Sequence, residues 1–248
     1  MKQITVVKVG GNELDDPAFL DGLSAAVARF AGPLVLVHGG GKEITAALGH
    51  YGVHSEFIGG LRVTSPEAMA IMQMVVCGTI NKRVVGRLVA DGARAIGLSG
   101  VDLALLGCVP QRPGGADLGR VGRITRVDTE AIKAMIDLGW LAVFAPVARG
   151  EGDGLSYNVN ADQVAQAIAG AFAGAELLFV SNVPGVILGG RVAAQLDRAD
   201  VTAAIASGEI SGGMVPKVQA ALDALDAGAA AARITNLAGF SGGGTRIV

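Results

Sequence analysis

The sequence predicts an α/β protein whose central sheet is mainly parallel and is covered by helices on both faces. Short runs of apolar, β-branched residues alternate with longer segments in which apolar residues recur at helical spacing. The strand-like runs are apolar throughout, which is typical of parallel strands buried on both faces. A chain of 248 residues, 51% hydrophobic and 17% charged, is large enough to form such a sheet with a substantial core.

The first quarter of the chain has the order strand, helix, strand, helix. Each strand runs directly into glycines, at residues 10–11 and 39–41, so each is expected to end in a tight loop. Pro17 suits the first position of the first helix, after a cap provided by Asp15 or Asp16. In order, the four elements are expected at 4–9, 17–30, 33–38 and 42–52.

The middle of the chain adds a hairpin, a long helix, a strand and an antiparallel flap. Two glycines break the short apolar runs of residues 55–64, which is typical of a hairpin. Ser65 can cap one long helix that has Pro66 at its first position and ends at Gly92. The strand and the flap follow at 94–100 and 108–127.

The second half resumes the alternation of helices and strands without any break in composition. We therefore expect a single domain over residues 1–248, with two lobes that meet at a cleft. The helices are expected at 128–138, 163–174, 198–207 and 215–228, and the strands at 141–146, 176–182, 233–237 and 244–248.

Composition and charge exclude several classes of function. A formal net charge of −2 favours neither nucleic acid nor an anionic membrane surface as a partner. The first residues are too short a run for a signal segment, and no apolar run is long enough to span a bilayer. Cys77 and Cys108 lack the spacing of metal ligands, so we expect two packing residues in a cytoplasmic protein with reduced thiols.

Several polar or glycine-rich segments stand just beyond predicted strands. They are Lys8, the glycines at 39–41, the NVNAD segment at 158–162, and Ser181 with Asn182. Ligands of open parallel sheets bind beyond the carboxyl ends of the strands, where backbone amides free of side chains can hold an anion. The sequence therefore favours a phosphate site here; tight turns without a ligand are the alternative.

Four charged side chains are candidates for that site, each with a plainer interpretation. Lys8 would be paired or point into a cavity, unless its stem lies on a sheet edge. Lys217 follows SGGM at a helix start, where it could equally be a solvated charge. Arg62 could hold a carboxylate by two parallel bonds or form a surface ion pair. Asp162 could be no more than a helix cap, although a segment with three polar residues in five has more of them than capping requires.

These motifs together resemble the N-acetylglutamate kinases of the amino-acid kinase family. The resemblance runs from Lys8 to the C-terminus, and each motif alone is weak, whereas the ordered set is specific. The motifs that carry it are KVGG, VHGGG, GGLRVT, NVNAD and GGMVPKV. It implies the amino-acid kinase fold, with an N-terminal lobe of about 1–175 that binds an N-acylated acidic amino acid. A C-terminal lobe of about 176–248 would bind ATP.

The resemblance also implies a role for each matching residue. Lys8 and Lys217 would flank the transferring phosphoryl group, and Asp162 would orient the two lysines. Backbone amides would hold the phosphoryl oxygens at Gly10, Gly11, Gly39, Gly40 and Gly41. The amino acid would contact Gly40, Arg62, Asn158 and Asn160, with Arg62 on its α-carboxylate. The adenine nucleotide would be bordered by Ser181, Asn182, Val183, Gly185, Ile210, Gly212, Gly213 and Met214.

The implied reaction is transfer of a phosphoryl group from ATP, with Mg²⁺, to the side-chain carboxylate of N-acetyl-L-glutamate. A carboxylate of pKa about 4.3 is ionised at neutral pH, so the acceptor needs no general base, and the motifs offer none. Alignment and charge compensation then carry the reaction, and the resemblance assigns no residue as a metal ligand. The product is an acyl phosphate, so we expect the segment at 50–64 to act as a lid that excludes water.

Two departures from the pattern bear on the acceptor. Asn182 replaces an aspartate that acetylglutamate kinases usually carry, and the SNVPG and CGTINKR segments look more like kinases of N-acetyl-2-aminoadipate in lysine synthesis. One methylene is worth only about 1–3 kcal/mol in a pocket, so dual use is open. Some of those relatives act on a carrier-bound substrate, which could dock on Arg112, Arg120, Arg123 and Arg126; a solvated basic hairpin is the alternative.

Two further questions are how the chain assembles and whether it is an enzyme at all. Relatives inhibited by arginine carry an extra N-terminal helix that links dimers into a hexamer, whereas this chain begins almost at its first strand. The resemblance therefore implies a homodimer without that control, with the long helix after Ser65 at its interface. A non-catalytic amino-acid or nucleotide sensor is the other class of function; retention of both Lys8 and Lys217 argues against it.

Overall fold

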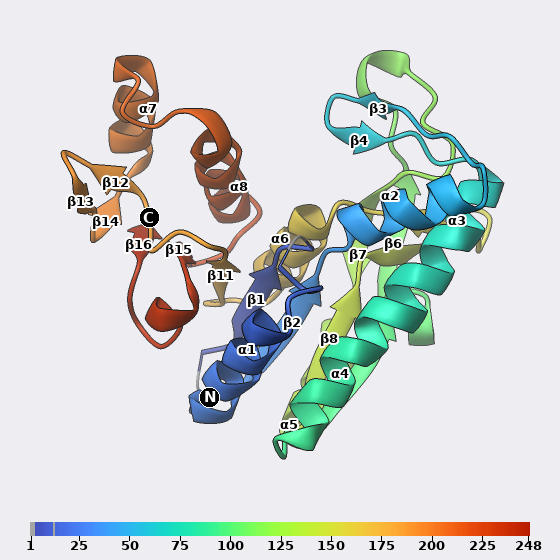
Figure 1. The fold of residues 1–248 in the computed structure, drawn as a ribbon, viewed down its shortest axis with the longest axis horizontal. Helices are drawn as coiled ribbons and strands as arrows, with labels where there is room; N and C mark the ends of the chain where they lie inside the picture. Colours follow the sequence, from blue (N-terminus) through green and yellow to red (C-terminus); the bar gives the residue numbers. More distant parts are fainter. Residues whose placement is uncertain (1–2, 12) are drawn as a thin grey trace.

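One eight-stranded sheet runs through the centre of the protein (Figure 1). The computed structural model describes residues 3–11 and 13–248. All neighbouring strands of this sheet are parallel except β15 and β16, which confirms the expected mainly parallel sheet. In spatial order the strands are β14 (Gln195–Leu196), β16 (Thr245–Ile247), β15 (Ala231–Thr235), β11 (Glu176–Val180), β1 (Thr5–Val9), β2 (Leu34–His38), β8 (Leu141–Ala145) and β5 (Ala95–Ser99).

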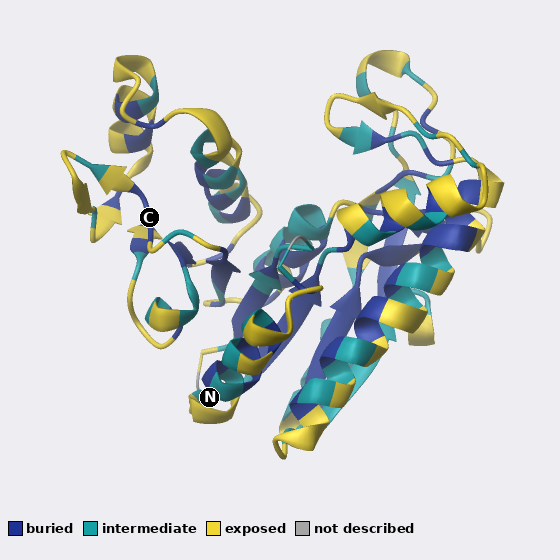
Figure 2. Ribbon diagram, viewed as in Figure 1, coloured by how far each residue is buried: buried dark blue, intermediate teal, exposed yellow. Residues whose placement is uncertain are grey.

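Helices cover both faces of the sheet, as the apolar strands require. Alternate residues of β2 point to opposite faces: Val35 and Val37 join one core cluster, and Leu34 and Leu36 join the other. The first cluster includes α5 (Thr129–Asp137), α6 (Ala161–Ala171), α7 (Arg198–Ser207) and α8 (Val215–Asp226). The second includes α1 (Pro17–Arg29) and α4 (Asn81–Ala90). Figure 2 shows the central strands β1, β2, β8 and β11 as mainly buried and the outer helix faces as exposed.

The long helix expected after Ser65 is continuous but not regular. It consists of α3 (Pro66–Gln73), a π-helical segment (Met74–Ile80) and α4, while α2 (Gly41–His50) packs against its first half. Ser65 caps α3 by accepting a hydrogen bond from the Ala68 amide, as expected. The π-helical turns change the phase of the side chains relative to a straight α-helix. Asn81, the first residue of α4, is consequently 1% exposed and directed into the core.

A second sheet and two hairpins complete the fold. The small sheet has the order β10 (Ser156–Asn158), β9 (Val147–Gly150), β6 (Leu106–Pro110) and β7 (Gly122–Val127), and its antiparallel β6–β7 pair is the expected flap. The hairpin expected within 55–64 is β3 (Phe57–Ile58) with β4 (Leu61–Arg62). A hairpin that we did not expect joins β12 (Ile187–Leu188) to β13 (Arg191–Val192). Short 3-10 turns lie at Asp102–Ala104, Pro113–Gly115, Gly212–Met214 and Leu237–Gly239.

Two sequence-based exclusions have structural counterparts. Among the described residues, no helix combines the length and apolarity that crossing a membrane requires. Both cysteines are free, and burial raises the pKa of the Cys77 thiol to about 11 and that of the Cys108 thiol to about 12. Thiols with such pKa values stay protonated at neutral pH, which is the behaviour of packing residues rather than nucleophiles.

Candidate active site

Two cavities meet at a single ion pair. Lys8 lies near the carboxyl end of β1, and its Nζ is 2.9 Å from Oδ1 of Asp162 in the first turn of α6. Both residues line a cavity of about 370 Å³ and also a neighbouring cavity of about 350 Å³. Because β1 is paired on both sides, Lys8 is not on a sheet edge, and its side chain is only 19% exposed. The Lys8–Asp162 pair therefore marks the boundary between two potential binding sites.

The glycines after β1 and β2 bring two loops into direct backbone contact. A Cβ added to Gly11 would fall against the amide nitrogen of Gly40, and one added to Gly39 would lie 2.9 Å from the Gly11 nitrogen. Only glycine allows this approach. At Gly41, by contrast, a Cβ would have open space. Gly11, Gly39, Gly40 and Gly41 all line the first cavity, and Gly10 lines the second.

The first cavity begins at the N-terminus of α2. Within the described part of the chain, the amides of Gly40 and Gly41 donate no hydrogen bond. Free amides and the positive end of the helix dipole both favour an anion at this position. The glycine run thus packs two loops together and leaves two amides that could bind an anion.

Arg62 is a buried cation at the other side of the first cavity. Its residue is 8% exposed, and burial lowers the pKa of the guanidinium from its ordinary value. Nη1 donates to Ser55 Oγ at 2.9 Å and Nη2 donates to Thr45 Oγ1 at 2.7 Å, while the Phe57 ring lies 4.6 Å from Cζ. Within residues 3–11 and 13–248 it forms no ion pair, so the surface ion pair considered above is wrong. A buried guanidinium without a carboxylate favours an anionic ligand.

The NVNAD segment lines the first cavity, and one of its residues also caps a helix. Asn158 donates to Thr64 Oγ1 at 3.2 Å, and Thr64 donates to the backbone carbonyl of Arg62 at 2.7 Å. Asn160 caps α6 by accepting a hydrogen bond from the Asp162 amide at 2.7 Å. The capping role considered for Asp162 therefore belongs to Asn160. Asn158, Asn160 and Asp162 all line the first cavity.

The second cavity contains the other predicted lysine. Lys217 lies in the first turn of α8, and it shares this cavity with Ser181, Asn182 and Gly213 as well as with the Lys8–Asp162 pair. Two lysines from distant parts of the sequence thus line one cavity. The cavity also receives Glu13, whose Oε2 is buried and accepts no hydrogen bond from the described residues.

The remaining residues expected to border a nucleotide do not line either cavity. Ile210 is 2% exposed and belongs to the core, and a Cβ on Gly185 would meet Thr245 and Val192, so these two positions have packing roles. The others in this group are Val183, Gly212 and Met214. These three residues are neighbours in sequence of Asn182 and Gly213, which line the second cavity, but they do not line it themselves.

Sequence reasoning missed the residues that hold the predicted ones in place. Thr45 and Ser55 fix the Arg62 guanidinium, Thr64 links Asn158 to β4, and Glu13 is aimed into the second cavity. Glu13 lies three residues after Gly10. Its closeness in sequence to the predicted phosphate loop is the feature that could have identified it as a site residue. Among the described residues, no group of three or more His, Cys, Asp or Glu side chains could hold a metal ion.

Comparison with known proteins agrees with this geometry. Residues 3–236 match the model of the amino acid kinase family. The chain is 64% identical over 246 residues to the acetylglutamate kinase of Chloroflexus aurantiacus, covering 99% of this chain and 97% of the relative. It is 50% identical over 243 residues to the acetylglutamate kinase of Roseiflexus sp. strain RS-1, covering 98% and 92%. The crystal structure of smu.665 from Streptococcus mutans UA159 superposes with a TM-score of 0.81 at 28% identity, covering 100% of this chain and 99% of that one. The protein therefore belongs to the amino acid kinase family.

Proposed function

We propose that this protein transfers a phosphoryl group from ATP to the side-chain carboxylate of N-acetyl-L-glutamate, giving N-acetylglutamyl phosphate for arginine biosynthesis. The observation that carries the proposal is Arg62, a buried cation without a carboxylate partner among the described residues, in a cavity that continues to Lys8. An N-acylated acidic amino acid supplies one carboxylate for Arg62 and a second to act as the acceptor. The relatives named acetylglutamate kinase, at 50% and 64% identity over almost the whole chain, support this choice.

Each cavity suits one substrate. Arg62 and Asn158 favour the amino acid in the first cavity, so this substrate would lie mainly on the N-terminal lobe of about 1–175. Ser181, Asn182 and Lys217 favour the nucleotide in the second cavity, mainly on the C-terminal lobe of about 176–248. The phosphoryl group would then pass between the substrates at the Lys8–Asp162 pair, the point that both cavities share.

The residues at this junction support transfer by positioning and charge compensation. The two ammonium groups would neutralise charge that spreads over the equatorial oxygens, and the free amides of Gly40 and Gly41 would donate hydrogen bonds to them. Asp162 would hold Lys8 at the correct place through the 2.9 Å ion pair. Because the acceptor carboxylate is already ionised at neutral pH, no proton has to be removed from it.

The donor set fits Mg²⁺ that arrives with ATP rather than a permanent metal centre. Mg²⁺ is usually held by one or two carboxylates together with substrate phosphates, and it supplies further charge neutralisation. The buried Glu13 Oε2, which has no hydrogen-bond partner among the described residues, provides such a carboxylate in the second cavity. Lys8, Lys217 and the glycine amides would perform the remaining charge compensation.

The two sequence departures, at residues 77–83 and 181–185, supply no lining residue to the proposed amino-acid cavity. Asn182 lines the second cavity only, and Arg83 of the CGTINKR segment forms a two-bond pair with Glu43 at 2.5 and 3.0 Å. Neither residue contacts the space beside Arg62, so neither favours a longer acceptor. The basic flap is also partly neutralised, since Arg120 pairs with Asp153 at 3.6 Å and Arg126 with Glu151 at 3.6 Å. This weakens the case for a carrier protein as the docking partner.

Acceptor choice is tested by trapping the acyl phosphate with hydroxylamine. We expect kcat/KM for N-acetyl-L-glutamate to exceed that for N-acetyl-2-aminoadipate, by about 10-fold or more if one methylene decides the difference. A higher value for the longer acid would overturn the choice of acceptor. Absence of acyl phosphate with either acid and ATP would overturn the proposed function, in favour of a sensor.

We also expect a cytoplasmic homodimer. The long interrupted helix exposes Met74 and Val89, at 54% and 50%, and such apolar side chains favour contact with a second copy of the chain. Light scattering at physiological concentration measures the mass directly, and a hexamer would contradict this expectation.

A further inference from the structure

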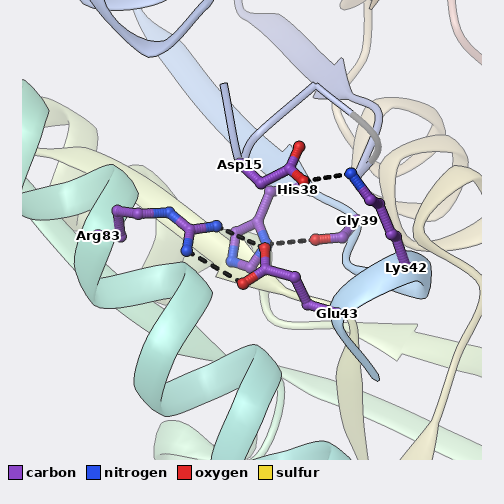
Figure 3. Close-up of polar contacts among 6 residues, drawn as sticks. All are labelled: Asp15, His38, Gly39, Lys42, Glu43 and Arg83. Carbon is purple, nitrogen blue, oxygen red and sulfur yellow. Dashed lines mark hydrogen bonds and ion pairs between the residues drawn. The ribbon is translucent and has the colours of Figure 1, made fainter. Parts of the chain in front are cut away.

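His38 is a buried histidine that the proposed reaction does not use. It is the last residue of β2, is fully buried, and directly precedes the three glycines at the first cavity. Its Nδ1 lies 2.9 Å from the carbonyl oxygen of Gly39, as Figure 3 shows. Its Nε2 lies 3.1 Å from Nδ2 of Asn81, at the start of α4. The two ring nitrogens therefore connect the glycine loop to the long helix.

The partners of Asn81 determine which ring nitrogen carries the proton. Asn81 Nδ2 is also 2.9 Å from the carbonyl oxygen of Val143, which can only accept a hydrogen bond. Asn81 Oδ1 accepts from Lys82 Nζ at 3.2 Å. The amide group facing His38 is thus the donor, so Nε2 must accept and the ring proton must be on Nδ1. From there it is donated to the Gly39 carbonyl.

The surroundings keep this ring neutral. Burial, followed by the nearby positive charge of Arg83, lowers the pKa of His38 to about 4, although its bond to Gly39 opposes the shift. The other charged groups near the ring are Glu43, which is paired with Arg83, and Lys82. Figure 3 shows the Arg83–Glu43 pair beside the histidine. At neutral pH the imidazole is therefore a fixed donor to Gly39 rather than a titrating group.

This hydrogen bond restrains the peptide between Gly39 and Gly40, in addition to the backbone bonds from the Gly39 amide to Val9 and from the Ile44 amide to Gly40. In a planar trans peptide the carbonyl of Gly39 and the N–H of Gly40 point in opposite directions, and no cis bond occurs among the described residues. Holding the carbonyl toward the buried ring turns the Gly40 amide away from it. Consecutive glycines have the largest conformational freedom of any residues, so they do not fix this orientation themselves.

We propose that His38, held by Asn81 as its neutral Nδ1–H tautomer, is a positioning residue that fixes the Gly39–Gly40 peptide so that the amides of Gly40 and Gly41 face the phosphoryl group in transit. The purpose of these amides rests on the proposed function. The hydrogen-bond chain itself rests only on the contacts of His38 and Asn81. It gives a role to the histidine of VHGGG and to the asparagine of CGTINKR, which are far apart in the sequence.

Two substitutions separate positioning from packing. In His38→Asn the side-chain amide can take the place of Nδ1 and donate to Gly39, whereas in His38→Gln the amide reaches the place of Nε2 and contacts Asn81 instead. Both variants remove the imidazole and both leave a neutral amide in its place. A packing role predicts similar losses in the two, whereas a positioning role predicts that only His38→Asn keeps the bond to the loop.

The kinetic arm measures kcat and KM for N-acetyl-L-glutamate and ATP. We expect kcat of His38→Gln to fall about 10²-fold with little change in either KM, because misplaced donors weaken the transition state more than binding. His38→Asn should recover most of this loss. His50→Gln is the matched control, since His50 is exposed at the end of α2. Equal kcat values for His38→Asn and His38→Gln would overturn the proposal.

The spectroscopic arm requires neither substrate nor turnover. Long-range ¹H–¹⁵N spectra of the wild-type protein distinguish a protonated Nδ1 from a protonated Nε2. With three histidines in the chain, the His38 signals are those that remain in both His50→Gln and His54→Gln, two exposed positions. We expect a protonated Nδ1 and a bare Nε2 at pH 7. Protonation at Nε2 would overturn the proposal even if both variants failed to fold. A wild-type protein with the expected tautomer but no kinase activity would instead contradict the proposed function.

Discussion

Lys8 Nζ lies 2.9 Å from Asp162 Oδ1, and among the described residues this pair alone lines both cavities of the candidate site. Lys8 is the last residue but one of β1, just before a glycine loop. Asp162 lies in the first turn of α6, more than 150 residues later in the sequence. In the proposed function, their pairing would fix an ammonium group between two substrates that are both negatively charged. Phosphoryl transfer depends on such fixed charges.

Replacing Lys8 by alanine should lower kcat by about 10²–10³-fold, the usual effect of removing one preorganised transition-state contact. Asp162→Asn should have a smaller effect in the same direction, because Lys8 remains but loses its ionic partner. Initial rates at saturating substrates measure both. Lys133→Ala is the control, since Lys133 forms an exposed ion pair with Asp137 on α5. If Lys8→Ala kept full kcat, the shared junction would not be the place of transfer.

Replacing Arg62 by lysine should mainly weaken binding of the acidic amino acid. Lysine keeps a positive charge but cannot donate to Ser55, to Thr45 and to a carboxylate in one plane. Loss of a charge-assisted hydrogen bond raises KM for that substrate by about 10- to 100-fold. KM for ATP should remain unchanged, because Arg62 lines only the first cavity.

Steady-state titration of each substrate provides that comparison, with Arg112→Lys as a control on an exposed arginine of the flap. An equal rise in both KM values would mean that Arg62 acts on the whole structure rather than on one substrate.

Two glycines of the site should respond to alanine in opposite ways. A Cβ at Gly11 meets backbone atoms of Gly40, which cannot move aside, so we expect Gly11→Ala to lower the free energy of unfolding by about 1–3 kcal/mol. A Cβ at Gly41 has open space at the start of α2, so Gly41→Ala should be neutral or stabilising by up to about 1 kcal/mol. Urea unfolding followed by circular dichroism measures both free energies.

Activity gives a second readout for this pair of glycines. Gly41 lines the first cavity, so its added methyl group would occupy substrate space and lower kcat/KM without lowering stability. A Gly41→Ala variant that was stable and fully active would indicate that no ligand approaches this amide.

The fold was predictable because its signals are local. Strands buried on both faces leave continuous apolar runs, and the glycines after β1 and β2 mark where those strands end. The β12–β13 hairpin had a comparable signal that we did not use, namely Gly189 and Gly190, which have φ of 54° and 78° between its strands. Positive φ at both central residues is what a tight hairpin turn requires.

The supporting contacts of the site were not predictable, because they depend on register between distant segments. Arg62 was identified from its own motif, but its partners Thr45 and Ser55 are ordinary hydroxyl residues in sequence. Asn81 contacts His38 and directly follows a π-helical segment, which changes the direction of the side chains after it. No residue preference predicts such a segment. Residues expected to contact substrate could be recognised from sequence motifs, whereas the residues that hold them in place are determined by packing between distant segments.

The buried His38 should make the protein less stable in mild acid. Its pKa is 6.5 when exposed and about 4 in the folded protein, so between these values the unfolded chain binds more protons. The contribution of His38 to the free energy of unfolding is therefore fully present above about pH 6.5. It is lost as the pH falls toward 4, by about 3 kcal/mol in total and about 2 kcal/mol by pH 5. Acidic groups also titrate at low pH, so the contribution of His38 must be isolated by a variant.

His38→Asn provides that isolation, because it removes the titrating ring and leaves every carboxylate in place. We expect the free energy of unfolding to fall by about 2 kcal/mol more in the wild-type protein than in His38→Asn between pH 7.5 and pH 5. Urea titrations at both pH values, with His50→Gln measured alongside, give the difference. Parallel losses in wild-type and His38→Asn would mean that the ring already accepts a proton in the folded state, which is incompatible with a neutral histidine fixed between Asn81 and Gly39.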